Sequence, residues 1–370
     1  MSISEFSSKF ISFVFNKYLL SLLILIGFFI NFFLIYIILI LILLKLYLEN
    51  KKIFFLILSY VLVTLLLFDF WNLKKPKLTK YNIASNVEYS IHPEIGYRPK
   101  KNRYFKEEIY LKNNKINEIQ YTINEFGHRI TGDENKKSKK CIFVHGGSFA
   151  FGQMLNDEQS LPFLINLKLK NNFRVYNFAF NGYGPHQFLR KLEVRYLEDY
   201  SDCSDTIVLY EMIPDHIGRV AGKRSWGDKS PRYFIKGNNL MHGGFFSKYP
   251  YKILMKIRKN FRNSKFISTF IYNPEKITNY DNQVFLKVLE QIEVKSKINF
   301  HKVNFLYVAW NLDLIKNSEI IEFIKSRNNI DINQIDFKGN KTTNEYDGHP
   351  SFLANDIISD EIIKKINLAE

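Results

Sequence analysis

The chain has 370 residues, of which 46% are hydrophobic and 16% aromatic, so it can bury a sizeable core and is not globally disordered. A net charge of +16 suggests nucleic-acid binding, but the lysines are scattered and neither zinc-finger spacing nor a basic helix occurs, so we expect no nucleic-acid partner. A solvated, lysine-rich surface near anionic lipid is the preferred interpretation. The only cysteines, Cys141 and Cys203, exclude a disulfide framework and do not favour even one bridge.

Residues 1–72 predict a membrane anchor. Residues 19–44 are 26 in a row without a charge, which at about 1.5 Å per residue is long enough to cross the roughly 30 Å hydrocarbon layer of a bilayer. After a polar break, residues 53–71 form a second apolar run, interrupted near its end by Asp69. We expect two antiparallel transmembrane helices in contact with membrane lipids. A single span followed by an interfacial helix is the alternative.

The lysines around these two segments predict their orientation. Six lysines lie in the flanks outside the hairpin, and three lie in the loop between the two spans. Under the positive-inside rule, this difference places both termini in the cytoplasm. Large domains can be translocated despite such charges, so the lysines alone do not decide the side.

Residues 73–140 are interpreted as a linker and a lead-in segment. Pro76 and several lysines follow the last apolar residue, as is common in linkers. The alternating stretch 118–123 and the turn at 124–127 predict irregular structure and a hairpin that cover the main sheet.

From residue 141 onward, short apolar runs alternate with amphipathic segments. This alternation predicts a parallel sheet covered by helices on both faces, and so one α/β domain over residues 141–370. The predicted strands are 141–145, 174–179, 205–211, 303–309 and 331–337. The predicted helices are 157–170, 185–199, 281–298, 317–327 and 350–366. Residues 216–280 break the rhythm and are interpreted as an insertion that forms a lid or a substrate-facing cap.

Chemically capable residues follow four of the predicted strands. In an open parallel sheet, the ligand crevice lies beyond the C-terminal ends of the strands, so we expect these residues to share one face. In chain order they are Ser148, then Asn181 and Gly182, then Asp215 and His216, and finally Asp347 and His349.

Ser148 and His349 are candidates for nucleophilic catalysis. Ser148 follows the glycine turn 146–147, where its hydroxyl can meet a base. His349 has the pKa for that base near neutrality, and Asp347, two residues earlier, can fix its tautomer. Gly182 lacks a Cβ and can bring a backbone N–H close to a developing oxyanion. The alternative is that both stretches are ordinary turns.

The other histidines carry weaker signals. They have no ligand-like spacing, so we predict no metal site. His145 is expected to pack or to hydrogen-bond locally, and His186, at a helix start, to be structural or to line the pocket. His145-Gly146-Gly147 is also typical of lipases with the α/β-hydrolase fold, but those need a downstream Gly-x-Ser-x-Gly elbow, and the chain has none.

Taken together, these blocks resemble the SGNH/GDSL hydrolase superfamily. Gly146-Gly147-Ser148 is similar to its first block, with Gly in place of the usual Asp, and Gly182 is similar to the glycine of its second block. Asp347 and His349 look like the last block, with one intervening residue where two are common. The third block departs from the pattern. The family expects Gly-x-Asn-Asp, whose Asn is an oxyanion donor, but residues 211–216 contain no asparagine.

The resemblance implies a flavodoxin-like three-layer α/β/α sandwich and an acyl-serine mechanism that needs no metal and no organic cofactor. Ser148 would attack an ester carbonyl, His349 would act as base and then as acid, and Asp347 would orient His349. The N–H groups of Ser148 and Gly182 would hold the oxyanion, with His216 as a substitute for the missing asparagine.

Three further residues at the same strand ends are expected to bind substrate: Asn181, His186 and Asp215. An ionised Asp215 would repel an oxyanion, however, so either His216 or another donor substitutes for the missing asparagine, or the activity is weak.

The resemblance implies a membrane-anchored serine esterase acting on O-acyl, above all O-acetyl, esters of carbohydrate or lipid. An O-acyltransferase that modifies an envelope polysaccharide is one alternative, and a catalytically degenerate glycan-binding domain is another, because of the missing asparagine. Membrane-anchored relatives often act on envelope glycans or lipids. This favours a bacterial inner-membrane location with the domain on the extracytoplasmic side, against the lysine count.

Overall fold

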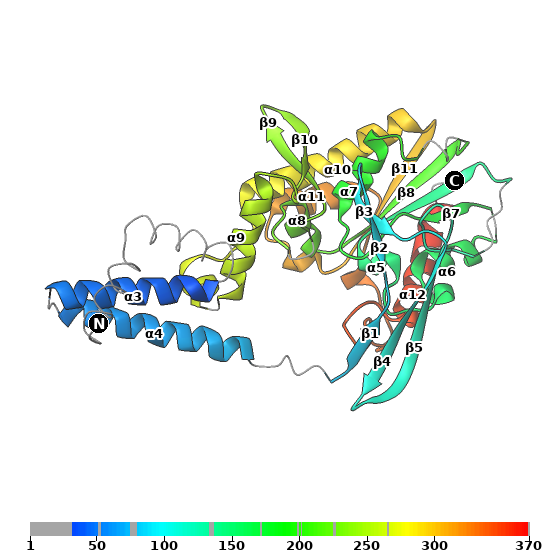
Figure 1. The fold of residues 1–370 in the computed structure, drawn as a ribbon. Helices are drawn as coiled ribbons and strands as arrows, with labels where there is room; N and C mark the ends of the chain where they lie inside the picture. The colour runs from blue at the N-terminus through cyan, green and yellow to red at the C-terminus, as the bar shows by residue number, and fades with distance from the viewer. Residues whose placement is uncertain are drawn as a thin grey trace. The chain divides into compact units, whose positions relative to one another are not determined.

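The computed structural model describes residues 32–50, 53–74, 80–132, 137–170, 172–197, 200, 202–224, 227–264 and 266–368 (Figure 1). The chain forms two compact units. The larger unit lies within residues 79–248 and 277–370, and the smaller one lies within residues 1–78 and 249–276.

A five-stranded parallel sheet forms the centre of the larger unit. Its strands are β6 (Lys140–Gly146), β7 (Arg174–Asn177), β8 (Asp205–Met212), β11 (Lys302–Ala309) and β12 (Asn329–Asp331). They are arranged in the order β12-β11-β8-β6-β7. Counted along the chain this is 2-1-3-4-5, the strand order of flavodoxin-like folds. The predicted last strand, 331–337, is misplaced, because the strand ends at Asp331, whose side chain accepts a hydrogen bond from the N–H of Asn333 and starts a 3₁₀ turn.

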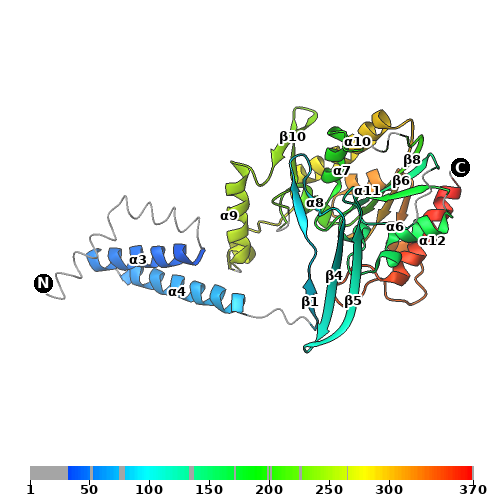
Figure 2. The same ribbon diagram turned by 45° about the vertical axis from the view of Figure 1, so that its right-hand side comes forward.

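Helices cover both faces of this sheet, as the alternation predicts (Figure 2). Side chains of β6 alternate between the two faces, since successive residues of a strand point in opposite directions. Ile142 and Val144 join the apolar core with one group of helices, and Phe143 joins the other group. The first group is α6 (Leu161–Lys168) and α12 (Phe352–Asn367). The second group is α7 (Pro185–Glu193), α10 (Asn279–Asn299) and α11 (Ser318–Lys325).

The lead-in segment is more regular than expected. It forms an antiparallel sheet of β1 (Asn82–Ser85), β4 (Arg103–Leu111) and β5 (Asn114–Ile123) in the order β1-β4-β5. It also forms the hairpin of β2 (Tyr89–His92) and β3 (Gly96–Pro99). Arg129 bridges Ile123 at the end of β5 to Asn177 at the end of β7, and so links this sheet to the edge of the central one.

The insertion predicted at 216–280 is divided between the two units. The larger unit keeps α8 (Asp215–Val220) and the hairpin of β9 (Pro231–Lys236) and β10 (Asn239–Phe245). The smaller unit takes α9 (Tyr251–Asn263) and the π-helix Ile267–Ile271. There the N–H of Phe266 donates a 2.9 Å hydrogen bond to the buried Asp69. The insertion is therefore not a single cap.

The smaller unit also contains the helices α3 (Phe32–Asn50) and α4 (Ile53–Lys74), at the positions of the predicted membrane spans. Residues 19–31 of the first predicted span lie outside the described residues. In the part of the chain that is described, no helix has both the length and the apolar character needed to cross a membrane. Lys45 and Glu49 form an ion pair inside α3, and Asp69 lies inside α4. The prediction of two transmembrane helices is not confirmed.

A disulfide joins Cys141 to Cys203, contrary to the expectation from the sequence. Cys141 lies on β6 and pairs with Thr206 of the neighbouring strand β8, so Cys203, just before β8, is brought beside it. The Cα atoms are 5.7 Å apart, within the range that a disulfide requires. Sequence spacing gave no hint of this, because 62 residues separate the two cysteines.

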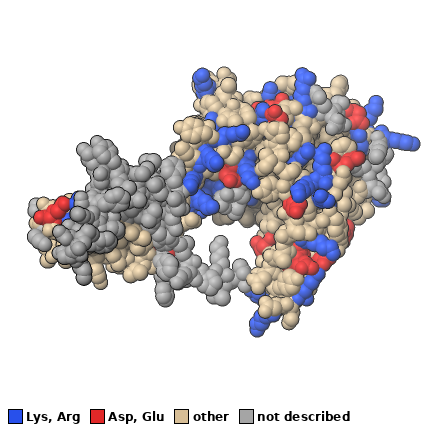
Figure 3. All heavy atoms as spheres, viewed as in Figure 1, with Lys and Arg blue, Asp and Glu red and all other residues tan. Residues whose placement is uncertain are grey.

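Figure 3 shows lysine and arginine side chains distributed over the visible face of the larger unit, with aspartate and glutamate among them. This arrangement agrees with a solvated, lysine-rich surface.

Candidate active site

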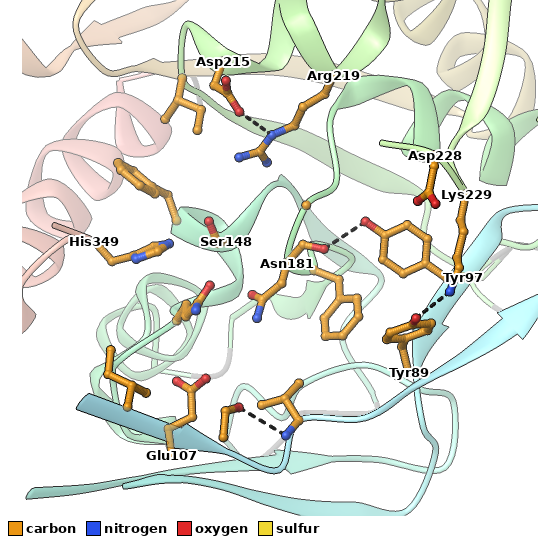
Figure 4. A pocket seen from close by; sticks show the side chains of 18 residues that line it. Tyr89, Tyr97, Glu107, Ser148, Asn181, Asp215, Arg219, Asp228, Lys229 and His349 are labelled. Atoms are coloured by element: carbon orange, nitrogen blue, oxygen red, sulfur yellow. Dashed lines mark hydrogen bonds and ion pairs between the residues drawn. The ribbon is translucent and has the colours of Figure 1, made fainter. Parts of the chain in front are cut away.

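A pocket of about 980 Å³ lies at the C-terminal ends of the central strands (Figure 4). The structure brings together there five of the residues that the sequence singles out: Ser148, Asn181, Gly182, Asp215 and His349. They come from loops that follow different strands. The pocket therefore forms where the sheet topology places a ligand crevice.

Ser148 is positioned by a turn that has no room for a side chain at the preceding residue. It is the first residue of the short helix α5 (Ser148–Phe151) and directly follows Gly147. A Cβ atom on Gly147 would overlap Nη1 of Arg219 and lie 2.8 Å from Nε2 of His216. This crowding explains why Gly stands where the resemblance expects Asp. Ser148 is only 6% exposed, and it lines the pocket.

His349 and Asp347 form the pair that the sequence predicts. Nδ1 of His349 lies 2.7 Å from Oδ2 of Asp347, and the backbone N–H of His349 donates to Oδ1 of the same carboxylate. Burial opposes ionisation of Asp347, but the hydrogen bonds from His349 hold the pKa of this carboxyl below its ordinary value. The imidazole also contacts the ring of Phe149, the residue after Ser148, at 5.3 Å between centroids, and it lines the same pocket as Ser148.

Two backbone N–H groups are suitably placed to meet an oxyanion. Gly182 has a φ of +79°, which glycine adopts without strain. The preceding carbonyl, of Asn181, accepts a 2.9 Å hydrogen bond from the hydroxyl of Tyr97, which holds the turn in place. Within the described part of the chain, neither the N–H of Gly182 nor that of Ser148 donates a backbone hydrogen bond. Both can therefore serve a ligand.

Arg219 is a pocket residue that the sequence did not reveal. Its Nε donates to Asp215 (2.9 Å), and its Nη1 donates to the carbonyl of Tyr183 (2.6 Å). Arg224 binds the other oxygen of Asp215. The carboxylate of Asp215 is therefore paired with two guanidinium groups and is not an isolated negative charge. The i, i+4 spacing of Asp215 and Arg219 is visible in the sequence, but their position at the pocket is not.

His216 and His186 are not among the residues that line the pocket. His216 is 1% exposed, and its Nδ1 lies 2.8 Å from the hydroxyl of Tyr210. Burial, helped by Arg219, lowers the pKa of His216 well below its ordinary value and that of His186 to about 3, so both are neutral. Nε2 of His216 lies 2.8 Å from the position that a Cβ on Gly147 would take, and His186 is fully buried. His145 packs, as expected, between the rings of Phe188 and Tyr210.

The lead-in segment also builds the site. Six of the 18 lining residues belong to it, so the pocket is not a property of the α/β domain alone. They are Ile83, Ser85, Val87, Tyr89, Tyr97 and Glu107. The signal in the sequence is the alternation from Ile83 to Tyr89, which puts every second side chain on one face. Among the described residues, no cluster of His, Cys, Asp and Glu is arranged to hold a metal ion.

Neither a protein-family model nor a curated protein matches the chain. The solved structures that it resembles include esterases at low sequence identity. The psychrotrophic esterase EstA from Pseudoalteromonas sp. is 15% identical over 62% of this chain and 97% of its own, with a TM-score of 0.34. A catalytic mutant of an acetylxylan esterase from Geobacillus stearothermophilus is 12% identical over 62% of this chain and 94% of its own, with a TM-score of 0.32. Such weak likenesses do not bear on function, which the site itself must indicate.

Proposed function

We propose that this protein is a serine esterase that cleaves O-acyl esters of carbohydrate or lipid through an acyl-serine intermediate. The observation that carries the proposal is that Ser148 and His349 line one pocket while Asp347 is bound to Nδ1 of His349. Because Nδ1–H donates to the carboxylate, Nε2 is the nitrogen left to accept the proton of the serine hydroxyl.

The mechanism requires two proton transfers in each half-reaction. Oγ of Ser148 bonds to the ester carbonyl carbon while its proton passes to Nε2 of His349. The imidazolium then protonates the departing oxygen, the alcohol leaves, and the acyl group remains on Ser148. Water repeats the sequence and releases the carboxylic acid. Asp347 remains ionised and stabilises the imidazolium in both halves.

Arg219 supports the proposal because its charge can replace the asparagine donor that the third block of the resemblance lacks. In the tetrahedral intermediate, the negative oxygen would accept hydrogen bonds from the N–H groups of Ser148 and Gly182. The net positive charge of Arg219, Arg224 and Asp215 would lie beside it, in place of a neutral asparagine side chain. A fixed cation stabilises developing negative charge.

An O-acyltransferase is the second candidate, because the pocket volume of about 980 Å³ far exceeds that of an acetyl group and can hold a second alcohol. The two activities differ only in what attacks the acyl-serine. Acyl transfer to an added oligosaccharide that outpaces hydrolysis would identify the transferase.

For the compartment, we favour the extracytoplasmic side. Disulfides such as Cys141–Cys203 form and persist in oxidising compartments and are rare in the cytosol. This observation weighs more than the lysine count, since large domains can be translocated despite flanking positive charge.

The test of the proposal is covalent labelling of the full-length chain with a fluorophosphonate, which reacts only with an activated serine. We expect labelling at Ser148 that is lost in both Ser148→Ala and His349→Ala. A folded parent that is not labelled would contradict the esterase and leave a glycan-binding domain as the remaining interpretation.

A further inference from the structure

Glu107 is a buried carboxylate that lines the pocket from the lead-in sheet (Figure 4). It lies on β4 and is 3% exposed. Its Oε2 accepts a hydrogen bond from the hydroxyl of Tyr121, and that hydroxyl accepts one from the N–H of Met154 (2.8 Å). Glu107 is thus held on the loop that follows Ser148, in a fixed orientation.

This structural role uses only one of the two carboxylate oxygens. No hydrogen bond joins Oε1 of Glu107 to a described residue, and Oε1 is not among the fully buried atoms that lack a partner, so it is open to the pocket. An ionised carboxylate only accepts hydrogen bonds, so a ligand group that replaces water at Oε1 must be a donor.

The surroundings of Glu107 indicate which kind of donor fits. The amide side chains of Gln153 and Asn181 line the same pocket, and so do the aromatic rings of Tyr89 and Tyr97. A carboxylate and amides beside aromatic faces suit a ring that carries several hydroxyl groups. Fatty acyl chains offer no donor at all.

The position of Glu107 in the pocket indicates which half of the ester, acyl or alcohol, it would contact. Figure 4 shows Glu107 entering the pocket below Ser148 and His349, on the side away from Arg219. In the proposed mechanism, His349 protonates the departing alcohol, whereas Arg219 faces the carbonyl oxygen. The alcohol half of the substrate therefore lies toward Glu107.

We infer that Glu107 binds hydroxyl groups of a saccharide that forms the alcohol half of the ester, an inference that rests on the proposed esterase function. Glu107 then determines specificity and takes no part in the chemical step. Its loss affects sugar esters and spares small activated esters that have no hydroxyl groups.

The test compares Glu107→Gln with Glu108→Gln in the full-length chain. The first change keeps an oxygen for the hydroxyl of Tyr121 and removes the charge. The second is a matched control, because Glu108 is the next residue of β4 and pairs with Lys115 outside the pocket. The measured quantity is kcat/KM for p-nitrophenyl acetate and for partially O-acetylated gluco- and xylo-oligosaccharides.

We expect Glu107→Gln to lower kcat/KM for the oligosaccharide esters about 10- to 100-fold, as for hydrogen bonds to a charged group, with p-nitrophenyl acetate changed by less than about 3-fold. Glu108→Gln should behave as the parent with both esters. Equal losses on both esters in Glu107→Gln would show a structural role only, and undiminished turnover of the oligosaccharides would exclude the contact. Either result overturns the inference.

A parent that hydrolyses neither ester would refute the proposed function but still allow the subsite to be judged. Titration calorimetry with the same oligosaccharides after deacetylation then compares the parent with Glu107→Gln. Binding that weakens at least 10-fold in the variant supports the saccharide contact. Equal binding by both proteins, or none by the parent, overturns it.

Discussion

The ion pairs of Asp215 change the charge that this residue contributes to the site. In the sequence it is a negative charge where the oxyanion should lie. In the structure, Arg219 and Arg224 both bind its carboxylate, and the group as a whole is positive. The charge of a site is therefore decided by partners that only the fold brings together, here at the end of β8 and in α8.

We predict that Arg219→Gln lowers kcat about 100- to 1,000-fold with little change in KM, since the loss falls on the transition state. Arg219→Lys should lose less, because the charge remains. Steady-state kinetics with p-nitrophenyl acetate measure both, and circular dichroism checks that the lost hydrogen bond to Tyr183 has not unfolded the protein. A kcat within about 3-fold of the parent in folded Arg219→Gln would remove Arg219 from the mechanism.

Glu211, at the end of β8, titrates unusually. Burial raises the pKa of its carboxyl to about 7, against the opposing effect of the hydrogen bond from Nε1–H of Trp310 (2.7 Å). The folded protein thus holds this proton more tightly than the unfolded chain, whose glutamate has an ordinary pKa of 4.5. The stabilisation is complete below pH 4.5 and is lost as the pH rises through about 7.

In the Glu211→Gln variant the side chain at this position cannot ionise, so the variant should not lose this stability as the pH rises. Between pH 5 and pH 8 the parent should lose roughly 2–3 kcal/mol of unfolding free energy relative to the variant. Urea unfolding of both proteins at the two pH values measures the difference. A difference in unfolding free energy between parent and variant that is the same at both pH values would mean that Glu211 does not titrate in this range.

At the scale of elements, Arg129 organises the loop that carries the nucleophile. The residue is 1% exposed, and its guanidinium donates to the carbonyls of Phe151 (2.9 Å), Gly152 (2.6 Å) and Leu155 (2.6 Å). Its Nε also pairs with Asp157 at 2.8 Å. The carbonyls at the end of α5 therefore depend on one side chain from the lead-in segment.

Replacing Arg129 by Met should cost about 3–5 kcal/mol, because it leaves Asp157 and several buried carbonyls without a partner. Lys115→Met removes a cation from the same sheet, but its carboxylate partners are more exposed, so less than about 1 kcal/mol should be lost. Urea unfolding compares the two variants. Similar small losses in both would show that Arg129 does not hold the loop.

Most elements after residue 141 could be predicted because each carries its own apolar period: four of the five strands and all five helices occur near their predicted positions, and the last strand is misplaced. The part of the pocket lining that comes from the lead-in segment could not be predicted. Ile83 to Tyr89 alternate in the sequence, but the face that they present depends on pairing that the sequence does not show: Ile83 and Ser85 lie on β1, which pairs with β4, and Tyr89 lies on β2, which pairs with β3. For the same reason Ser148 and His349 were identifiable from local turns, whereas Arg219 and Glu107 were not.

At the scale of the whole molecule, the disulfide closes a loop of 62 residues that contains α6, β7 and α7. Cys141 lies on β6, and Cys203 lies two residues before the start of β8. The bridge therefore links two neighbouring strands of the central sheet, β6 and β8. No local sequence pattern predicts such a bridge, because Cys141 and Cys203 become neighbours only when β6 and β8 pair in the sheet.

Cys203→Ser should lower the free energy of unfolding by roughly 2–4 kcal/mol, chiefly because the unfolded chain is no longer restricted. Thermal unfolding of the parent with and without dithiothreitol, beside the variant, measures the effect. The reduced parent and the variant should melt together below the oxidised parent. No difference between the oxidised and reduced parent would contradict the bridge.

The bridge from Arg129 to Asn177 has a further consequence. β7 is an edge strand, and an open edge is a template on which another copy of the chain can add itself. Arg129 pairs with Asn177, and the hydroxyl of Thr131 donates to the carbonyl of Val175 (2.7 Å), so part of this edge is already occupied. A variant whose lead-in segment detaches would expose this edge, and self-association could remove the protein from solution before any loss of activity is seen.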